Sequence, residues 1–126
     1  MRGTRLLTKD IFIDTDCISA FLWVGNESLL SQLYPGRVVM PKPVYDEIDR
    51  PALAWMKARV DSMINAGKLT VVELTSGTDE FDLYYKLTVN PDEGHKIIGD
   101  GEASSIALAK FKTGIVASNN FNDIFT

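Results

Sequence analysis

Histidine and cysteine are almost absent from this chain. Its 126 residues include one cysteine, Cys17, and one histidine, His95. A single cysteine forms no internal disulfide, which fits a reducing compartment, and we expect a cytoplasmic protein. One cysteine and one histidine are too few for the usual zinc sites, so oxygen ligands are the candidates for any metal site.

Long apolar segments are also lacking. The longest such stretch, residues 18–24, is too short to span a bilayer, and residues 1–10 lack the apolar core of a signal peptide. We therefore expect no membrane partner. With 45% hydrophobic residues and no low-complexity segment, the chain is predicted to form one domain over residues 1–126.

A basic excess, typical of proteins that bind nucleic acid duplexes without sequence preference, is missing as well. The chain has 13 Lys and Arg against 17 Asp and Glu, a formal charge of −4. Nucleic acid stays a candidate substrate, because a divalent cation bound among several carboxylates reverses their local sign.

Short apolar runs alternate with helical patterns along the chain. Strands are expected at residues 11–14, 38–40, 69–72 and 115–117. This order predicts an α/β fold of three α/β/α layers, with a central parallel sheet of about four strands. The chain ends soon after the fourth run, so we expect a C-terminal part shorter than that of a full doubly wound fold.

Capping residues predict where helices begin. We expect Asp16, Thr78 and Asp100 to cap the helices that follow them. The apolar spacing of the last helix predicts four inward-facing side chains, those of Ala103, Ile106, Ala107 and Phe111. The larger aromatic residues are expected in the core or an interface, namely Trp23, Trp55, Tyr84 and Tyr85.

Acidic residues recur where the pattern predicts the end of a strand or the start of a helix. They are Asp14, Asp16, Glu47, Asp100, Glu102 and Asp123. Side chains converge at such places in an open α/β sheet. Two-metal nucleases need several carboxylates from separate elements and no histidine, so these acids predict a site for Mg²⁺ or Mn²⁺.

Each acid alone has a simpler interpretation. An aspartate after a strand, such as Asp14, is commonly a turn or capping residue. Glu47 alone is typical of a solvated helix surface, and Asp100 with Glu102 is typical of a helix cap with a first-turn acid. The functional interpretation therefore rests on the order and context of these residues.

That order resembles the PIN-domain family, the metal-dependent ribonucleases that include VapC-like toxins of toxin–antitoxin pairs. The matching segments are residues 12–22 (FIDTDCISAFL), 41–48 (PKPVYDEI), 99–110 (GDGEASSIALAK) and 114–123 (GIVASNNFND). The segment GEASSIALA is the most specific of these. The resemblance covers nearly the whole chain and implies a PIN-like fold with endoribonuclease activity.

By this resemblance, the catalytic residues and metal ligands are Asp14, Glu47 and Glu102, with Mg²⁺ or Mn²⁺ as cofactor. The auxiliary residues are Thr15, Asp16, Asp100, Ser118, Asn119 and Asp123. RNA is the implied substrate, and an antitoxin protein is the implied partner. Apolar residues near the end of the chain, Phe121, Ile124 and Phe125, add the expectation of a homodimer.

One position departs from the family pattern. Asn120 stands where the family usually has an aspartate that binds metal. An amide oxygen can bind Mg²⁺ but brings no charge, so metal affinity should fall unless Asp123 compensates.

Two other functions stay open. The Asn119–Asn120 pair would also fit a PIN-like module that binds or assembles without turnover. Residues 11–18, IFIDTDCI, are similar to the start of haloacid-dehalogenase-like phosphatases, in which Asp14 would be a nucleophile and Asp16 a general acid. The phosphatase interpretation ranks below the other two, because the GEASSIALA helix has no counterpart in that family.

Overall fold

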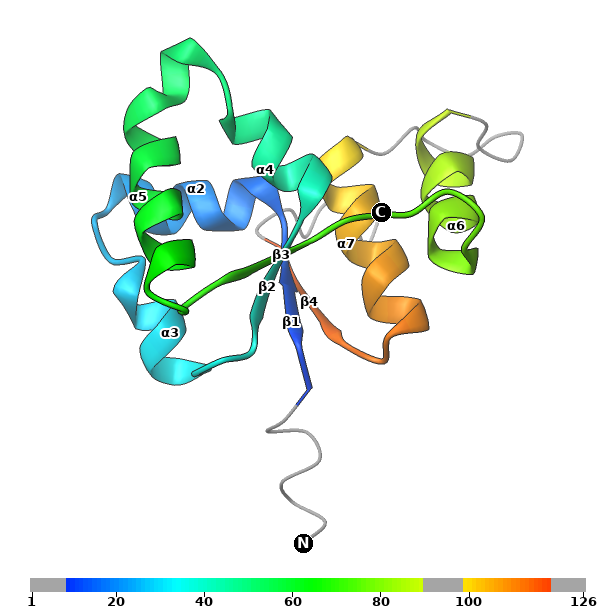
Figure 1. Ribbon diagram of the computed structural model, residues 1–126, viewed down its shortest axis with the longest axis horizontal. Coiled ribbons are helices and arrows are strands. Elements are labelled where there is room, and N and C mark those ends of the chain that lie inside the picture. Colours follow the sequence, from blue (N-terminus) through cyan, green and yellow to red (C-terminus); the bar gives the residue numbers. More distant parts are fainter. Residues whose placement is uncertain (1–8, 90–98, 119–126) are drawn as a thin grey trace, which may run out of the picture.

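The computed structural model describes residues 9–89 and 99–118 of the chain, arranged around a parallel four-stranded sheet (Figure 1). Its strands are β1 (Ile11–Ile13), β2 (Val38–Pro41), β3 (Thr70–Val72) and β4 (Ile115–Ala117), in the order β3-β2-β1-β4. The chain first builds outward from β1 to β3 and then adds β4 on the other side of β1. The strand order therefore reverses between β1 and β4, the place where open α/β sheets commonly bind ligands.

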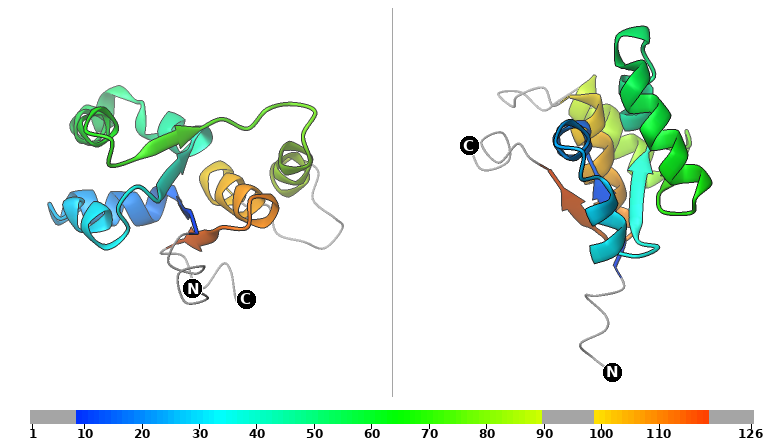
Figure 2. Two further views of the ribbon diagram at one scale, coloured as in Figure 1. Left: turned by 60° about the horizontal axis from the view of Figure 1, so that its bottom comes forward. Right: turned by 90° about the vertical axis from the view of Figure 1, so that its left-hand side faces the viewer.

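Helices cover both faces of this sheet. They are α2 (Thr15–Trp23), α3 (Ser28–Leu33), α4 (Lys42–Ile48), the 3₁₀ turn η1 (Pro51–Leu53), α5 (Ala54–Asn65), α6 (Asp79–Thr88) and α7 (Asp100–Phe111). Figure 2 shows α2 and α5 on one side of the sheet and α6 and α7 on the other. The predicted three-layer α/β/α architecture and parallel sheet are confirmed. Within residues 9–89 and 99–118, no helix is long and apolar enough to cross a membrane.

Two hydrophobic clusters hold the layers together. Because successive side chains of a strand point to opposite faces, Ile13 and Met40 pack toward α2, α4 and α5. Phe12 and Val39 pack with Leu108 of α7 on the other face. Burial on both faces explains why β1 and β2 are continuous apolar runs in the sequence.

The predicted caps are only partly correct. Thr78 caps α6, since its hydroxyl accepts a hydrogen bond from the Phe81 N–H at 3.2 Å. However, Asp14 and not Asp16 caps α2, and Gly99 and not Asp100 occupies the cap position of α7. A cap residue needs extended backbone dihedrals, which Asp14 has as the residue leaving β1 (φ −92°, ψ 173°), whereas Asp16 already lies within the helix.

The predicted inward face of α7 is also shifted. Ala103 and Ala107 are buried as expected, but Ile106 is half-buried and Phe111 is 43% exposed. The buried face is centred on Gly101, Ser104, Ser105 and Leu108, which follow the helical period of three and four residues. Phe111 lies to the side of that stripe.

Candidate functional site

Two strand ends meet at the point where the sheet order reverses. Ile13 of β1 is paired with Ala117 of β4, and the Asp14 N–H donates to the Ala117 carbonyl oxygen at 3.1 Å. Asp14 and Ser118 each follow these paired residues directly. Their side chains form a hydrogen bond, so two of the residues that the resemblance implies are neighbours.

On the other side of the two strand ends, helix α4 contacts Gly101 of α7. The Gly101 N–H, at the start of α7, donates to Oε1 of Glu47 on α4 at 2.8 Å. A Cβ atom added to Gly101 would lie 2.5 Å from Thr15 Oγ1 and 3.1 Å from Glu47 Oε1. Three helices therefore meet closely here, and glycine is required for their approach.

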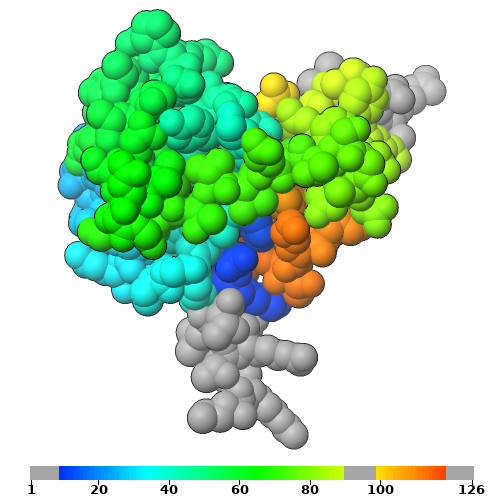
Figure 3. Space-filling model, viewed as in Figure 1, coloured from blue at the N-terminus to red at the C-terminus, as the bar shows by residue number. Residues whose placement is uncertain are grey.

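These contacts define the crevice, a name used below for the place where Asp14, Thr15, Glu47, Gly101 and Ser118 come together. It lies at the carboxyl edge of the sheet. In the space-filling view the surface is hollowed between α4 and α6, and the first residues of α7 are visible at the base of the hollow (Figure 3). The fold thus brings residues far apart in the sequence to one edge.

Asp14 is the buried acid of the crevice. Only 2% of its surface is exposed. Burial raises the pKa of its carboxyl above the ordinary value, while hydrogen bonds from Ser118 and from the Cys17 N–H oppose the rise. The negative charges of Asp16 and Glu47 raise the pKa further. A cation bound nearby would relieve both the burial cost and the repulsion.

The Thr15 hydroxyl is unsatisfied. Its Oγ1 atom is buried and has no hydrogen-bond partner in the described parts of the chain. Buried polar atoms rarely lack a hydrogen-bond partner in the protein unless a water, ion or ligand takes that position. Carboxylate and hydroxyl oxygens are hard donors, so the residues present fit Mg²⁺ or Mn²⁺ better than a softer metal.

The remaining predicted acids in the described residues are less buried than Asp14. Asp16 and Asp100 are exposed, and Glu102 is half-buried in the first turn of α7. Across residues 9–89 and 99–118, no three or more His, Cys, Asp or Glu residues form a group arranged to hold a metal ion. Three predicted site residues, Asn119, Asn120 and Asp123, lie outside the described residues.

Tyr84 is a neighbour of the crevice that its sequence context did not reveal. It lies half-buried on α6, the helix that packs along α7. Burial raises the pKa of its phenol, and the charges of Asp100, Glu47 and Asp46 raise it further. The ring is therefore near the acids, although its local pattern predicted only a core or interface position.

Gly101 was part of the recognised segment, yet its role was also missed. The signal was present in the sequence, because a glycine in the second position of a helix weakens the helix unless close packing requires it. What it packs against cannot be read from the sequence, since Thr15 and Glu47 are distant along the chain.

No family model matches the chain, and no curated protein matches it. The resemblance to PIN domains therefore rests on the sequence segments, with the crevice as its structural context.

Proposed function

We propose that this protein is a Mg²⁺- or Mn²⁺-dependent endoribonuclease that hydrolyses phosphodiester bonds of RNA, and that it acts as the toxin of a toxin–antitoxin pair. One observation carries the enzymatic part. The buried carboxylate of Asp14 lies at the reversal point of the sheet, within the electrostatic influence of Glu47 and beside the start of α7.

The two carboxylates have distinct roles in this proposal. Asp14 is fixed by the Cys17 N–H at 2.9 Å, and Glu47 is fixed by the Gly101 N–H. Neither side chain needs to reorganise to present its remaining oxygen lone pairs. A bound divalent cation would activate the attacking water and stabilise charge that develops on the phosphate.

Two carboxylates are sufficient for a divalent cation when RNA phosphates and water supply its remaining ligands. Mg²⁺ usually keeps several waters and is bound by one or two carboxylates together with substrate phosphates. Glu102 and Asn120 are the further ligands that the family resemblance implies. The positive end of the α7 dipole, next to the crevice, favours an anionic phosphate there.

Cleavage of a structured RNA mixture tests this function. Purified protein is incubated with Mg²⁺, with Mn²⁺ and with EDTA, beside two single-charge variants. Asp14→Asn keeps a good capping residue for α2, so it removes the charge without removing the cap. Asp49→Asn removes an exposed acid at the end of α4 and serves as the matched control.

We expect metal-dependent cleavage that falls at least about a hundredfold in Asp14→Asn, the scale seen when a group that stabilises the transition state is removed. Cleavage should stay unchanged in Asp49→Asn. Cleavage that persists in EDTA, or equal activity of Asp14→Asn and wild type, would refute the proposed mechanism.

A binding or assembly module is the second candidate, and one observation favours it. Both crevice carboxylates already make structural hydrogen bonds, with the Cys17 N–H and the Gly101 N–H. On this account the acids maintain the fold, and no RNA is cleaved in any metal. Stable RNA binding without cleavage in the same assay would support this module.

A further inference from the structure

Both tryptophans of the chain lie on the surface, away from the crevice. Trp23, at the end of α2, is 71% exposed, and Trp55, at the start of α5, is 39% exposed. Their rings meet edge to face with centroids 5.2 Å apart. Val24, beside them in the chain, is 75% exposed. Exposed aromatic side chains that contact each other are typical of interaction sites, because large apolar side chains are more often buried.

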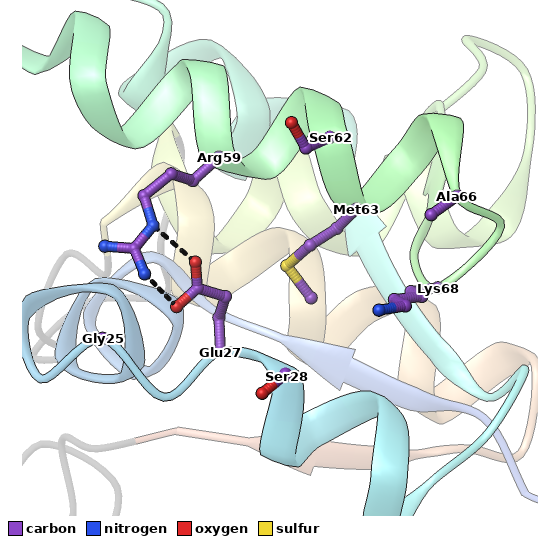
Figure 4. Close-up of a pocket in the computed structure, with 8 residues that line it drawn as sticks. All are labelled: Gly25, Glu27, Ser28, Arg59, Ser62, Met63, Ala66 and Lys68. Carbon is purple, nitrogen blue, oxygen red and sulfur yellow. Dashed lines mark hydrogen bonds and ion pairs between the residues drawn. The ribbon is translucent and has the colours of Figure 1, made fainter.

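A pocket of about 300 Å³ continues from this patch. Gly25 lines it directly after Trp23 and Val24, and Arg59 lines it one helical turn after Trp55 on α5. Figure 4 shows these residues with the rest of the lining, which comprises Glu27, Ser28, Ser62, Met63, Ala66 and Lys68. The Trp groove, as we call the patch together with the pocket, thus has an apolar end and a polar end.

Glu27, the acid at the polar end of the groove, is already paired with a cation. Arg59 binds both carboxylate oxygens of Glu27, with Nε 2.5 Å from Oε2 and Nη2 2.6 Å from Oε1. The Glu27 side chain is only 13% exposed. Its charge is therefore not available to a ligand.

Lys68, the second cation at the polar end, is not paired with an acid in the described part of the chain. Lys68 is exposed, and its ammonium makes no hydrogen bond or ion pair within residues 9–89 and 99–118. Ser28 and Ser62 are the uncharged polar residues of the same lining. Among the described residues that line the pocket, Lys68 therefore carries the one charge that is not paired with an opposite charge.

We propose that the Trp groove binds a peptide segment of a partner protein that carries an apolar anchor followed within a few residues by an acidic side chain. The anchor packs on Trp23 and Trp55, and the acid pairs with Lys68. Tryptophan and arginine are the residues that dominate binding energy at interfaces, and both are present here. The groove is separate from the crevice, so this proposal does not depend on ribonuclease activity.

Charge complementarity favours this occupant over two others. A second copy related by twofold symmetry would bring the two Lys68 side chains to the same interface, and the described pocket lining offers no unpaired acid to meet them. A nucleic acid would need several cations along its backbone, whereas the groove offers one unpaired lysine beside apolar rings.

Selection from a phage-displayed library of random peptides tests the proposal. Wild-type protein is the target, and the Trp23→Ala/Trp55→Ala double variant is used for counter-selection. Because both side chains are at the surface, the double variant should fold normally. We expect the recovered peptides to share an apolar residue with a nearby Asp or Glu.

Binding of a synthesised peptide is then measured by tryptophan emission, which reports on the groove directly because the chain has no other tryptophans. We expect affinity to fall at least about tenfold in Trp23→Ala and in Lys68→Glu. Leu33→Ala, at an exposed apolar residue of α3 outside the groove, should bind like wild type.

Three results would overturn the proposal. The first is the absence of peptides enriched over counter-selection, or enrichment without acidic residues. The second is a wild-type dimer in sedimentation that Trp23→Ala dissociates, which would assign the groove to a second copy. The third is displacement of the peptide by a short single-stranded RNA, which would assign it to nucleic acid.

Discussion

At Asp14 the end of a strand, the start of a helix and a buried charge coincide. Its carboxylate accepts the Cys17 N–H as the cap of α2, yet it is shielded from water and lies in the field of Asp16 and Glu47. Capping favours the ionised form, while burial and the neighbouring acids disfavour it. The pKa of Asp14 is raised, so the unfavourable effects are larger.

This balance predicts a pH-dependent effect of Asp14→Asn on stability. Because the folded-state pKa is raised, the stabilising contribution of Asp14 is complete below its unfolded pKa, about 4, and is lost as the pH rises through the folded pKa. Asparagine does not ionise but still caps the helix. Hence the free energy of unfolding of Asp14→Asn, relative to wild type, should increase from about pH 4 upward.

Urea denaturation of both proteins between pH 3.5 and pH 7, without divalent cations, measures this difference. Asp14→Ala is the companion variant, which loses the cap and should cost about 1 kcal/mol relative to Asp14→Asn. A difference between Asp14→Asn and wild type that does not change with pH would contradict the raised pKa.

The contact between Gly101 and Thr15 gives a second prediction for single residues. Gly101→Ala places a Cβ atom 2.5 Å from Thr15 Oγ1, so it should destabilise the protein by about 1–3 kcal/mol despite the better helix propensity of alanine. Thr15→Ala removes the unsatisfied hydroxyl and should cost little. In the double variant part of the loss should be recovered, because the nearest obstructing atom is gone while Glu47 Oε1 stays 3.1 Å away.

A double-mutant cycle in urea measures this coupling. Gly99→Ala is the matched control, because a Cβ atom at Gly99 meets no atom of residues 9–89 and 99–118 within 4 Å. Additive effects of Gly101→Ala and Thr15→Ala would show that the two residues are not packed as described.

Among the elements, α7 shows most clearly where sequence patterns fail. The sequence predicted a helix here, but it placed the cap one residue late and Phe111 inside, and it did not include the serines among the inward-facing residues. Ser104 and Ser105 are buried because their hydroxyls donate to the carbonyl oxygens of Gly101, at 2.7 Å, and Ile13, at 3.2 Å. A buried hydroxyl with a partner costs little, yet it counts as polar in any periodicity analysis.

Strands and turns were easier to predict than helix faces. β1 and β2 are short apolar runs buried by the layers around them, and β3 and β4 at the edges of the sheet are partly exposed. Glycines and prolines between the runs mark the chain reversals. Helix caps were harder, because the choice between Asp14 and Asp16 depends on backbone dihedrals that the neighbouring strand sets.

The turn between α7 and β4 carries an element-scale prediction. A Cβ atom at Gly114 would collide with the Phe12 ring, which is buried in the core, and would lie 2.9 Å from the Asp10 carbonyl oxygen. Gly114→Ala should therefore shift β4 against β1 and cost about 1–3 kcal/mol. Thermal unfolding measures this loss, and stability equal to wild type would contradict the close packing of β4.

For the whole molecule, the alternation of strands and helices in the sequence was sufficient to predict the parallel three-layer fold. It was also sufficient to place Asp14 and Ser118 at one edge, because residues that follow adjacent parallel strands are neighbours. It was not sufficient to bring Glu102 into a group with Asp14 and Glu47, since side-chain positions on separate helices depend on how the layers pack.

The central claim is that the crevice binds the divalent cation on which RNA cleavage depends. Titration of the protein with Mn²⁺, followed by electron paramagnetic resonance of the free ion, tests it most directly. We predict saturable binding to wild type and to Asp49→Asn, and loss of that binding in Asp14→Asn. Wild-type protein that binds no Mn²⁺, or Asp14→Asn protein that binds it as tightly as wild type, would contradict the claim.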